Sequence, residues 1–176
     1  IAAAARTGPP AVEKLALRLK IGWGVGSLGS ATLLNAIGAM LLFYLVSVVG
    51  MGAALAGALI FVSKLYDMVT DPPMGWISDR TQSRWGRRRP WMLAGALVSG
   101  ASFVLLFNLP GDLGELALAA WVLFLLLLYA TGYTMFNVPY LAMPAEMTDG
   151  YHERSALMSF RVTFAALGIL SGNVIA

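Results

Sequence analysis

The sequence predicts an all-α, multi-pass membrane protein, and its composition and its hydropathy pattern both point to this class. Of 176 residues, 59% are hydrophobic and only 12% are charged, with a mean hydropathy of +0.74. Soluble domains are about 45–50% apolar and about 25% charged. The apolar residues gather into runs of the length that a helix needs to cross a bilayer. Because backbone polar groups in lipid must pair within their own element, we expect these runs to be helices.

Four complete helices and the beginning of a fifth account for these runs. We expect them at about 21–46, 52–77, 91–109, 116–143 and 156–176, the last one truncated, after an N-terminal segment at 1–20. The first run is too long and too far from the start to be a signal peptide. The sequence begins without methionine and ends within an apolar run, so we expect part of a longer membrane protein.

Positive charges alternate between the connections and so predict the orientation. The N-terminal segment carries four Lys or Arg residues and the connection at 78–90 carries five arginines, whereas the connections at 49–51 and 109–115 carry none. By the positive-inside rule, the N-terminus and the connections at 78–90 and 144–155 are cytoplasmic. We therefore expect a protein of the inner or plasma membrane, with the lipid bilayer as its partner.

The composition also excludes several classes of function. The absence of cysteine excludes disulfides, thiolate metal sites and cysteine catalysis, and a lone His152 argues against a histidine metal site. A net charge of +3 is too small and too segregated for a nucleic-acid-binding protein. No nucleophile–base pair or metal cluster is recognisable, so we expect neither an enzyme nor a cofactor.

The second predicted helix carries charged residues, which are costly in a membrane and normally mark function. Lys64, Asp67 and Asp71 are three and four residues apart and share one helical face. Two carboxylates one turn apart repel each other unless a cation, a proton or a basic group compensates. The pattern favours a site for Na⁺, which oxygen ligands suit, or for H⁺. A buried ion-pair network that only fixes helix packing is the other interpretation.

Two neighbouring features have two interpretations each. Pro72 and Pro73 either kink the helix or free backbone carbonyls that coordinate an ion. The fourth predicted helix has a polar side, which either contacts a cation or a hydroxylated substrate or makes interhelical hydrogen bonds. Its members are Tyr129, Tyr133, Thr134 and Asn137.

Two blocks of sequence carry a resemblance to a known family. The first runs from Lys64 through Asp71-Pro72-Pro73 to Trp91, and the second comprises residues 137–140, 145–154 and 160–161. They strongly resemble the glycoside–pentoside–hexuronide:cation symporters, the melibiose-permease-like branch of the major facilitator superfamily. The resemblance extends from about residue 22 onward and covers the first five of the family's twelve helices.

This resemblance implies the N-terminal part of a major facilitator superfamily bundle. It also implies a secondary active transporter that couples symport of a sugar or related small solute to H⁺ or Na⁺. The family's two cation-binding acids of helix two correspond to Asp67 and Asp71, with Thr70 and Asn137 as possible supporting ligands. Thr70 stands where melibiose permeases have asparagine, and Asn137 where they have aspartate. The smaller number of acids slightly favours H⁺.

Candidate residues for the solute are Tyr133, Asn137 and Arg161. Arg161 lies near the start of the fifth predicted helix, and its other interpretation is an anchor at the inner membrane surface. The basic connection resembles the superfamily's loop between helices two and three, which takes part in a cytoplasmic gate. Charge pairs there can hold one face closed while the bundles rock about a central site. Positive charge that only sets topology is the other interpretation. The candidate gating residues are Asp79, Arg80, Arg87, Arg88, Glu153 and Arg154.

A second hypothesis is a structural or accessory subunit without transport activity. Five helices cannot form the two-bundle cavity that alternating access needs. A natural chain ending near residue 176 would favour this hypothesis, and a much longer one would favour the transporter. The expected partners are accordingly either the missing C-terminal bundle together with a small solute, or neighbouring membrane subunits.

Overall fold

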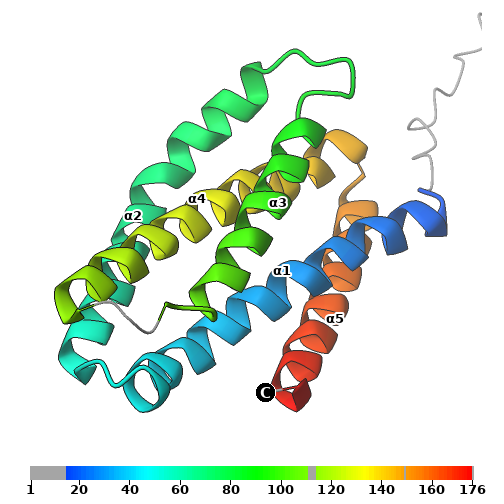
Figure 1. Ribbon diagram of the computed structural model, residues 1–176. Coiled ribbons are helices and arrows are strands. Elements are labelled where there is room, and N and C mark those ends of the chain that lie inside the picture. The colour runs from blue at the N-terminus through cyan, green and yellow to red at the C-terminus, as the bar shows by residue number, and fades with distance from the viewer. Residues whose placement is uncertain (1–14, 111–113, 149, 176) are drawn as a thin grey trace, which may run out of the picture.

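The computed structural model describes the backbone of residues 15–110, 114–148 and 150–175, and side chains up to residue 172 (Figure 1). Within these residues there are five long helices and no strand. They are α1 (Leu17–Phe43), which continues as a π-helix over Tyr44–Val48, α2 (Ala53–Arg80), α3 (Arg89–Leu106), α4 (Glu115–Met147) and α5 (Tyr151–Ile175). All five are long and apolar enough to cross a membrane. The predicted all-α membrane fold is confirmed.

Several helices extend beyond the predicted apolar runs. α1 begins at Leu17, so the end of the predicted N-terminal segment is helical, while residues 1–14 of that segment lie outside the described part of the chain. α4 continues to Met147 and α5 begins at Tyr151, which shortens the connection expected at 144–155. Hydropathy marks only the part of a helix that lies in hydrocarbon, whereas the helix itself continues into polar turns. The helices therefore extend past the apolar runs that the sequence predicts to lie in the membrane.

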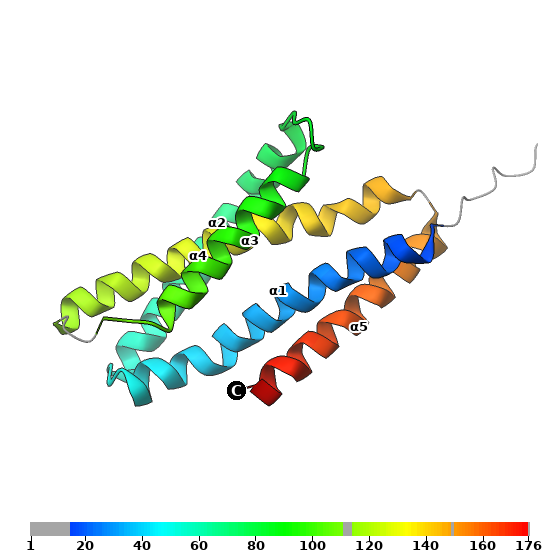
Figure 2. The same ribbon diagram turned by 45° about the vertical axis from the view of Figure 1, so that its right-hand side comes forward.

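The helices form two layers. α4 packs against both α2 and α3, and α1 packs against α5. Figure 2 shows α1 and α5 as one layer beside the group made by α2, α3 and α4. We call the end formed by the start of α1 and by the connections at 81–88 and 148–150 the basic end, and the opposite end the neutral end. The helices α1 and α5 are distant in sequence, so their packing does not follow from the order of the helices along the chain.

Buried apolar clusters join the two layers at both ends. At the neutral end, the end of α1, the start of α2 and the first half of α4 contribute to one cluster, which includes Leu41, Ala56 and Leu125. At the basic end, Trp23 of α1, Tyr140 of α4 and Leu157 of α5 form a second cluster. The polar side of α4 predicted from the sequence begins at Tyr129, which belongs to the first cluster, and continues toward the second.

Glycines allow very close contacts between the helices of each layer. A Cβ atom on Gly95 of α3 would lie 2.5 Å from the backbone nitrogen of Phe136, and one on Gly132 of α4 would lie 2.5 Å from that of Ser99. A Cβ atom on Gly168 of α5 would lie 2.5 Å from the carbonyl oxygen of Leu28. Small residues let helix backbones approach in this way within a membrane. Each layer is therefore held by direct backbone contact as well as by side chains.

Candidate functional site

The two acids of α2 have different environments. Oδ1 of Asp71 accepts a 2.8 Å hydrogen bond from Oγ1 of Thr134 on α4. Oδ2 of Asp67 lies 3.0 Å from Nζ of Lys64, and the Asp67 side chain is 18% exposed. The other oxygen of Asp67, Oδ1, is buried without a hydrogen-bond partner among the described residues. Asp71 is thus connected to α4, whereas Asp67 has one uncommitted oxygen.

Thr70 lies between these acids, but its hydroxyl points back to its own helix. Oγ1 of Thr70 is 3.0 Å from the carbonyl oxygen of Tyr66 and 3.3 Å from that of Asp67, so the backbone of α2 accepts its hydrogen. Only the lone pairs of this oxygen remain for a ligand. Thr70, the predicted supporting ligand, therefore lies near the acids, but its hydroxyl hydrogen is already donated to the backbone of α2.

The two prolines do not interrupt α2, which is continuous from Ala53 to Arg80. Proline has no amide hydrogen, so Pro72 and Pro73 leave the carbonyls of Met68 and Val69 without their usual partners four residues on. These carbonyls lie within the turn that also carries Asp71. Additional oxygen atoms are therefore present beside the two acids.

The predicted solute residues face the same region from α4 and α5. Tyr133 lies within electrostatic range of Asp67, Asp71 and Arg161. Asn137 follows Tyr133 by one helical turn and is half-buried. The structure therefore brings the two acids, Tyr133 and Arg161 into one neighbourhood, with Asn137 on the adjoining turn.

Arg161 lies deeper in its helix than the sequence predicted. It follows Tyr151, the first residue of α5, by ten positions and is not near the helix start. Its charge acts on both Tyr133 and Tyr140 of α4. Within the described part of the chain, no carboxylate forms an ion pair with Arg161. A basic group without an acidic partner, facing the interior, is available to a ligand.

Sequence reasoning missed two residues at this site. Thr134 bonds directly to Asp71, and the hydroxyl of Tyr129 is buried without a hydrogen-bond partner among the described residues. Both belong to the polar side of the fourth predicted helix, so the signal was present. Which of its members meets the acids depends on the register between α2 and α4, which the sequence does not give.

At the basic end, one arginine joins three helices. The Arg88 guanidinium, whose side chain is 10% exposed, lies 2.7 Å from Oδ1 of Asp79 at the end of α2 and 2.9 Å from Oε1 of Glu146 near the end of α4. Arg87 also contacts Glu146, at 2.8 Å. Glu146 was not among the predicted gating residues. Arg80 instead stacks over the Trp76 ring, 4.1 Å from its centre.

The two predicted gating residues of α5 are in its first turns and not in a loop. Glu153 pairs with Nζ of Lys20 at 2.7 Å, and both side chains are mostly buried, at 13% and 14% exposed. Arg154 donates hydrogen bonds to the carbonyl oxygens of Thr148 and Ala145. The pair formed by Lys20 and Glu153 joins α1 to α5, a connection that the predicted loop position of Glu153 did not suggest.

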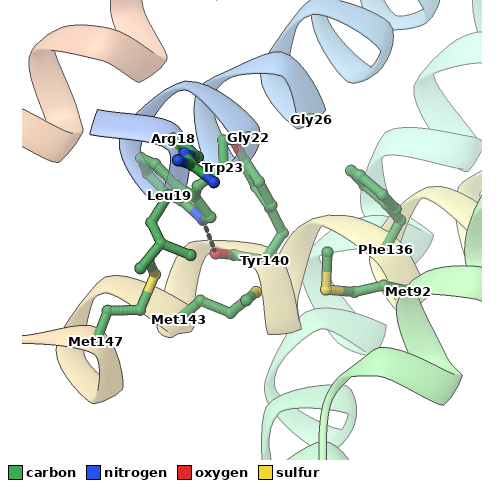
Figure 3. A pocket seen from close by; sticks show the side chains of 10 residues that line it. All are labelled: Arg18, Leu19, Gly22, Trp23, Gly26, Met92, Phe136, Tyr140, Met143 and Met147. Atoms are coloured by element: carbon green, nitrogen blue, oxygen red, sulfur yellow. Dashed lines mark hydrogen bonds between the residues drawn. The ribbon is translucent and has the colours of Figure 1, made fainter. Parts of the chain in front are cut away.

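A cavity of about 300 Å³ opens at the basic end between α1 and α4. Figure 3 shows Tyr140 beside Trp23, with methionines and Phe136 around them and Arg18 above. Its described lining contains none of the predicted cation or solute residues. This cavity is therefore separate from the acids of α2.

The donor set at the acids suits a singly charged ion. No group of three or more His, Asp or Glu side chains within the described ranges could hold a metal ion. Divalent cations take several carboxylate or carbonyl ligands in a defined geometry. Two carboxylates, one of them paired with a lysine, and nearby hydroxyl groups supply less negative charge. Such a set fits Na⁺ or H⁺ better than a divalent ion.

Comparisons with known proteins identify the family of the chain. A family described as MFS/sugar transport protein matches residues 22–176. The inner membrane symporter YicJ of Escherichia coli is 35% identical over 93% of this chain and 35% of its own length. YagG of the same organism, provisionally named a glycoside/cation symporter, is 39% identical over 94% of this chain and 36% of its own length. The sodium-dependent lysophosphatidylcholine symporter 1 of Gallus gallus is 29% identical over 93% of this chain and 31% of its own length.

The chain spans about a third of the length of these curated relatives. The family match covers most of the chain and includes every described helix except the first turn of α1. The chain therefore belongs to the MFS/sugar transport family and corresponds to the N-terminal part of a member of the major facilitator superfamily.

Proposed function

We propose that this chain is the cation-binding part of a secondary active transporter that couples movement of a sugar or related small solute to H⁺ or Na⁺. The observation that carries the proposal is the pair of acids on α2. Asp71 is bonded to Thr134 of α4, and Asp67 keeps a buried oxygen without a partner. Two negative charges in a membrane-spanning helix are costly, and Lys64 compensates only one of them. A bound cation supplies the missing positive charge.

The solute site is proposed for the adjoining region between α4 and α5. Tyr133 and Arg161 lie there within electrostatic range of each other, and Tyr133 is also within range of both acids. Ligands at adjacent points are coupled when each favours the same conformation of the protein. The name of YagG supports a glycoside, whereas the name of the chicken relative supports sodium and extends the solute class to lysophospholipids.

The proposed location is the inner membrane, with a cytoplasmic N-terminus. The name of YicJ supports this membrane, and the arginines at 78–90 support the orientation by the positive-inside rule. The ion pairs of Arg88 with Asp79 and Glu146 then lie at the cytoplasmic face. In the transport cycle they are proposed to hold the ends of α2, α3 and α4 together while the bundle rocks.

An accessory role without transport is not favoured, because the relatives that this chain matches are named as symporters. An accessory role also does not explain why Oδ1 of Asp67 is buried without a hydrogen-bond partner among the described residues.

The test is accumulation of radiolabelled sugars by proteoliposomes that contain the full-length protein, under imposed Na⁺ or H⁺ gradients. Wild type should accumulate at least one sugar under one gradient. Asp71→Asn should abolish the gradient dependence while the protein remains in the membrane. Glu115→Gln, which neutralises an exposed acid in the first turn of α4, should retain accumulation. Unchanged gradient-driven accumulation in Asp71→Asn would contradict the cation site, and no dependence on either gradient in wild type would contradict symport.

A further inference from the structure

Two buried polar atoms between α2 and α4 have no hydrogen-bond partner within the described part of the chain. They are Oδ1 of Asp67 and the hydroxyl oxygen of Tyr129. The Tyr129 residue is only 3% exposed, so water does not reach its hydroxyl freely. Buried polar groups in native proteins are almost always hydrogen-bonded, and each exception needs a physical explanation.

The two atoms belong to one neighbourhood. The charge of Asp67 acts on Tyr129, as does the neighbouring Tyr133. The rings of Tyr129 and Tyr133, one turn apart on α4, are stacked with their centres 6.0 Å apart, which restricts the orientation of the Tyr129 ring. The Asp67 carboxylate is also held, because its Oδ2 accepts a 3.0 Å hydrogen bond from Nζ of Lys64. The free oxygen of the carboxylate and the tyrosine hydroxyl are therefore both held in place and both lack a partner.

The chemistry of the two groups limits what can lie between them. A carboxylate only accepts hydrogen bonds, while a tyrosine hydroxyl offers lone pairs as well as one hydrogen. A direct hydrogen bond from Tyr129 to Asp67 would pair both atoms, and neither is paired. A proton alone does not bridge two oxygens that are not in hydrogen-bond contact. A cation with oxygen ligands does, since it binds the charged oxygen and the neutral one together.

We propose that Tyr129 is a ligand of the coupling ion, that its hydroxyl and Oδ1 of Asp67 bind the ion together, and that the ion is Na⁺. This inference rests on the proposed cation site at Asp67 and Asp71 and adds to it a neutral oxygen ligand and the identity of the ion. Without Na⁺ the Tyr129 hydroxyl destabilises the fold, because it is buried and unpaired. With Na⁺ the same hydroxyl contributes to binding.

Tyr129→Phe tests this directly, because it removes one oxygen atom and keeps the ring. The full-length protein is purified in detergent, and thermal unfolding is followed in NaCl or in choline chloride at equal ionic strength. In choline the Tyr129→Phe protein should unfold at a higher temperature than wild type. Its Na⁺ dissociation constant, from titration of the unfolding temperature or calorimetry, should be about tenfold higher, since one ligand of a charged group is lost.

Tyr44→Phe is the matched control. The Tyr44 hydroxyl is bonded to the carbonyl oxygen of Phe107 at 3.2 Å, at the neutral end of the bundle. Removing it should lower the unfolding temperature equally in both salts and leave the Na⁺ dissociation constant unchanged. In the absence of Na⁺, Tyr129→Phe should therefore raise the unfolding temperature and Tyr44→Phe should lower it. Only Tyr129→Phe should change the Na⁺ dissociation constant.

The other outcomes are distinct. If Tyr129→Phe binds Na⁺ as wild type does, or lowers the unfolding temperature in choline, the inference is overturned, and a bridging water explains the second result. If wild type binds no Na⁺ but accumulates solute with a proton gradient, the inference fails and the proposed function stands. If both Tyr129→Phe and Asp71→Asn bind Na⁺ as wild type does, the inference and the proposed cation site both fail.

Discussion

The hydroxyl of Thr134 donates a 2.8 Å hydrogen bond to Oδ1 of Asp71 and connects α4 to the acidic face of α2. A hydrogen bond to an ionised group is stronger than one between neutral groups. It fixes one carboxylate oxygen and leaves the other for a ligand. The position of Asp71 thus depends on α4 as much as on α2.

Thr134→Val should weaken cation binding by about tenfold, because a hydrogen bond to a charged group contributes about 1.5–3 kcal/mol. The variant keeps the shape of the side chain and removes the donor. Titration of cation-dependent thermal stability in the full-length protein measures the change.

Thr131→Val is the control for that variant. The Thr131 hydroxyl also bridges the two helices, at 3.0 Å from the Tyr66 hydroxyl, but the bond involves neither acid. We expect a loss of about 1 kcal/mol in unfolding free energy and unchanged cation affinity. Equal effects of the two valines on cation binding would contradict a specific role for Thr134.

Arg88→Gln should destabilise the protein far more than Arg87→Gln, although both arginines contact Glu146. The Arg88 side chain is 10% exposed and also pairs with Asp79, whereas the Arg87 side chain is 55% exposed. The partner side chains of Asp79 and Glu146 are 57% and 38% exposed, so we expect the loss of the buried guanidinium to cost about 1.5–3 kcal/mol, as for hydrogen bonds to charged groups. An exposed pair contributes about 0–1 kcal/mol. Thermal unfolding of both variants compares them, and similar losses would show that burial does not matter at this end.

Gly95→Ala should prevent close packing of α3 on α4, because the added Cβ would lie 2.5 Å from the backbone of Phe136. The backbone cannot move aside as a flexible side chain can, so we expect a severe loss of folded protein. Gly100→Ala on the same helix adds a Cβ that meets nothing within 4 Å. That variant should gain about 0.5–1 kcal/mol from the higher helix propensity of alanine. The yield of monodisperse protein in detergent and its unfolding temperature separate the two outcomes.

Tyr140→Phe should lower the unfolding free energy by about 1 kcal/mol, since it removes one buried hydrogen bond. The Tyr140 hydroxyl donates this bond, 2.6 Å long, to the carbonyl oxygen of Trp23, and the rings stack with centres 4.9 Å apart. Phenylalanine keeps the stacking, so expression and insertion should be unchanged. Tyr151→Phe, at a residue that is 79% exposed, should have no effect. A Tyr140→Phe protein as stable as wild type would contradict a joining role for this bond.

The parts of the fold that depend on local sequence could be predicted. Long apolar runs identified the spans, and the spacing of Asp67 and Asp71 placed both acids on one face, because helical periodicity relates residues three and four apart. The polar turns beyond the hydrocarbon were missed, since hydropathy does not detect them. Glu153 was assigned to a loop for this reason.

The parts that depend on contacts between distant segments could not be predicted. Glu146 meets Arg88 across 58 residues, and Thr134 meets Asp71 across 63. Each helix offers several polar residues, and only the crossing and register of the packed helices decide which ones meet. The sequence therefore indicated a polar side on the fourth helix without identifying Thr134 and Tyr129 as its members nearest the acids.

The pairing of α1 with α5 has a consequence for the order of synthesis. Ser27 and Thr32 of α1 bond to carbonyl oxygens of α5 that are 134 and 136 residues away along the chain. At roughly 5–20 residues per second, a ribosome needs on the order of ten seconds to make that length. During this interval α1 is in the membrane without its partner, while α2, α3 and α4 emerge and can pack together. Each hydroxyl also lies within hydrogen-bond distance of a carbonyl oxygen in α1, that of Gly24 or Leu28, so its one hydrogen has an acceptor before α5 is made. Although α1 is made before the other four described helices, it is therefore among the last of them to be packed.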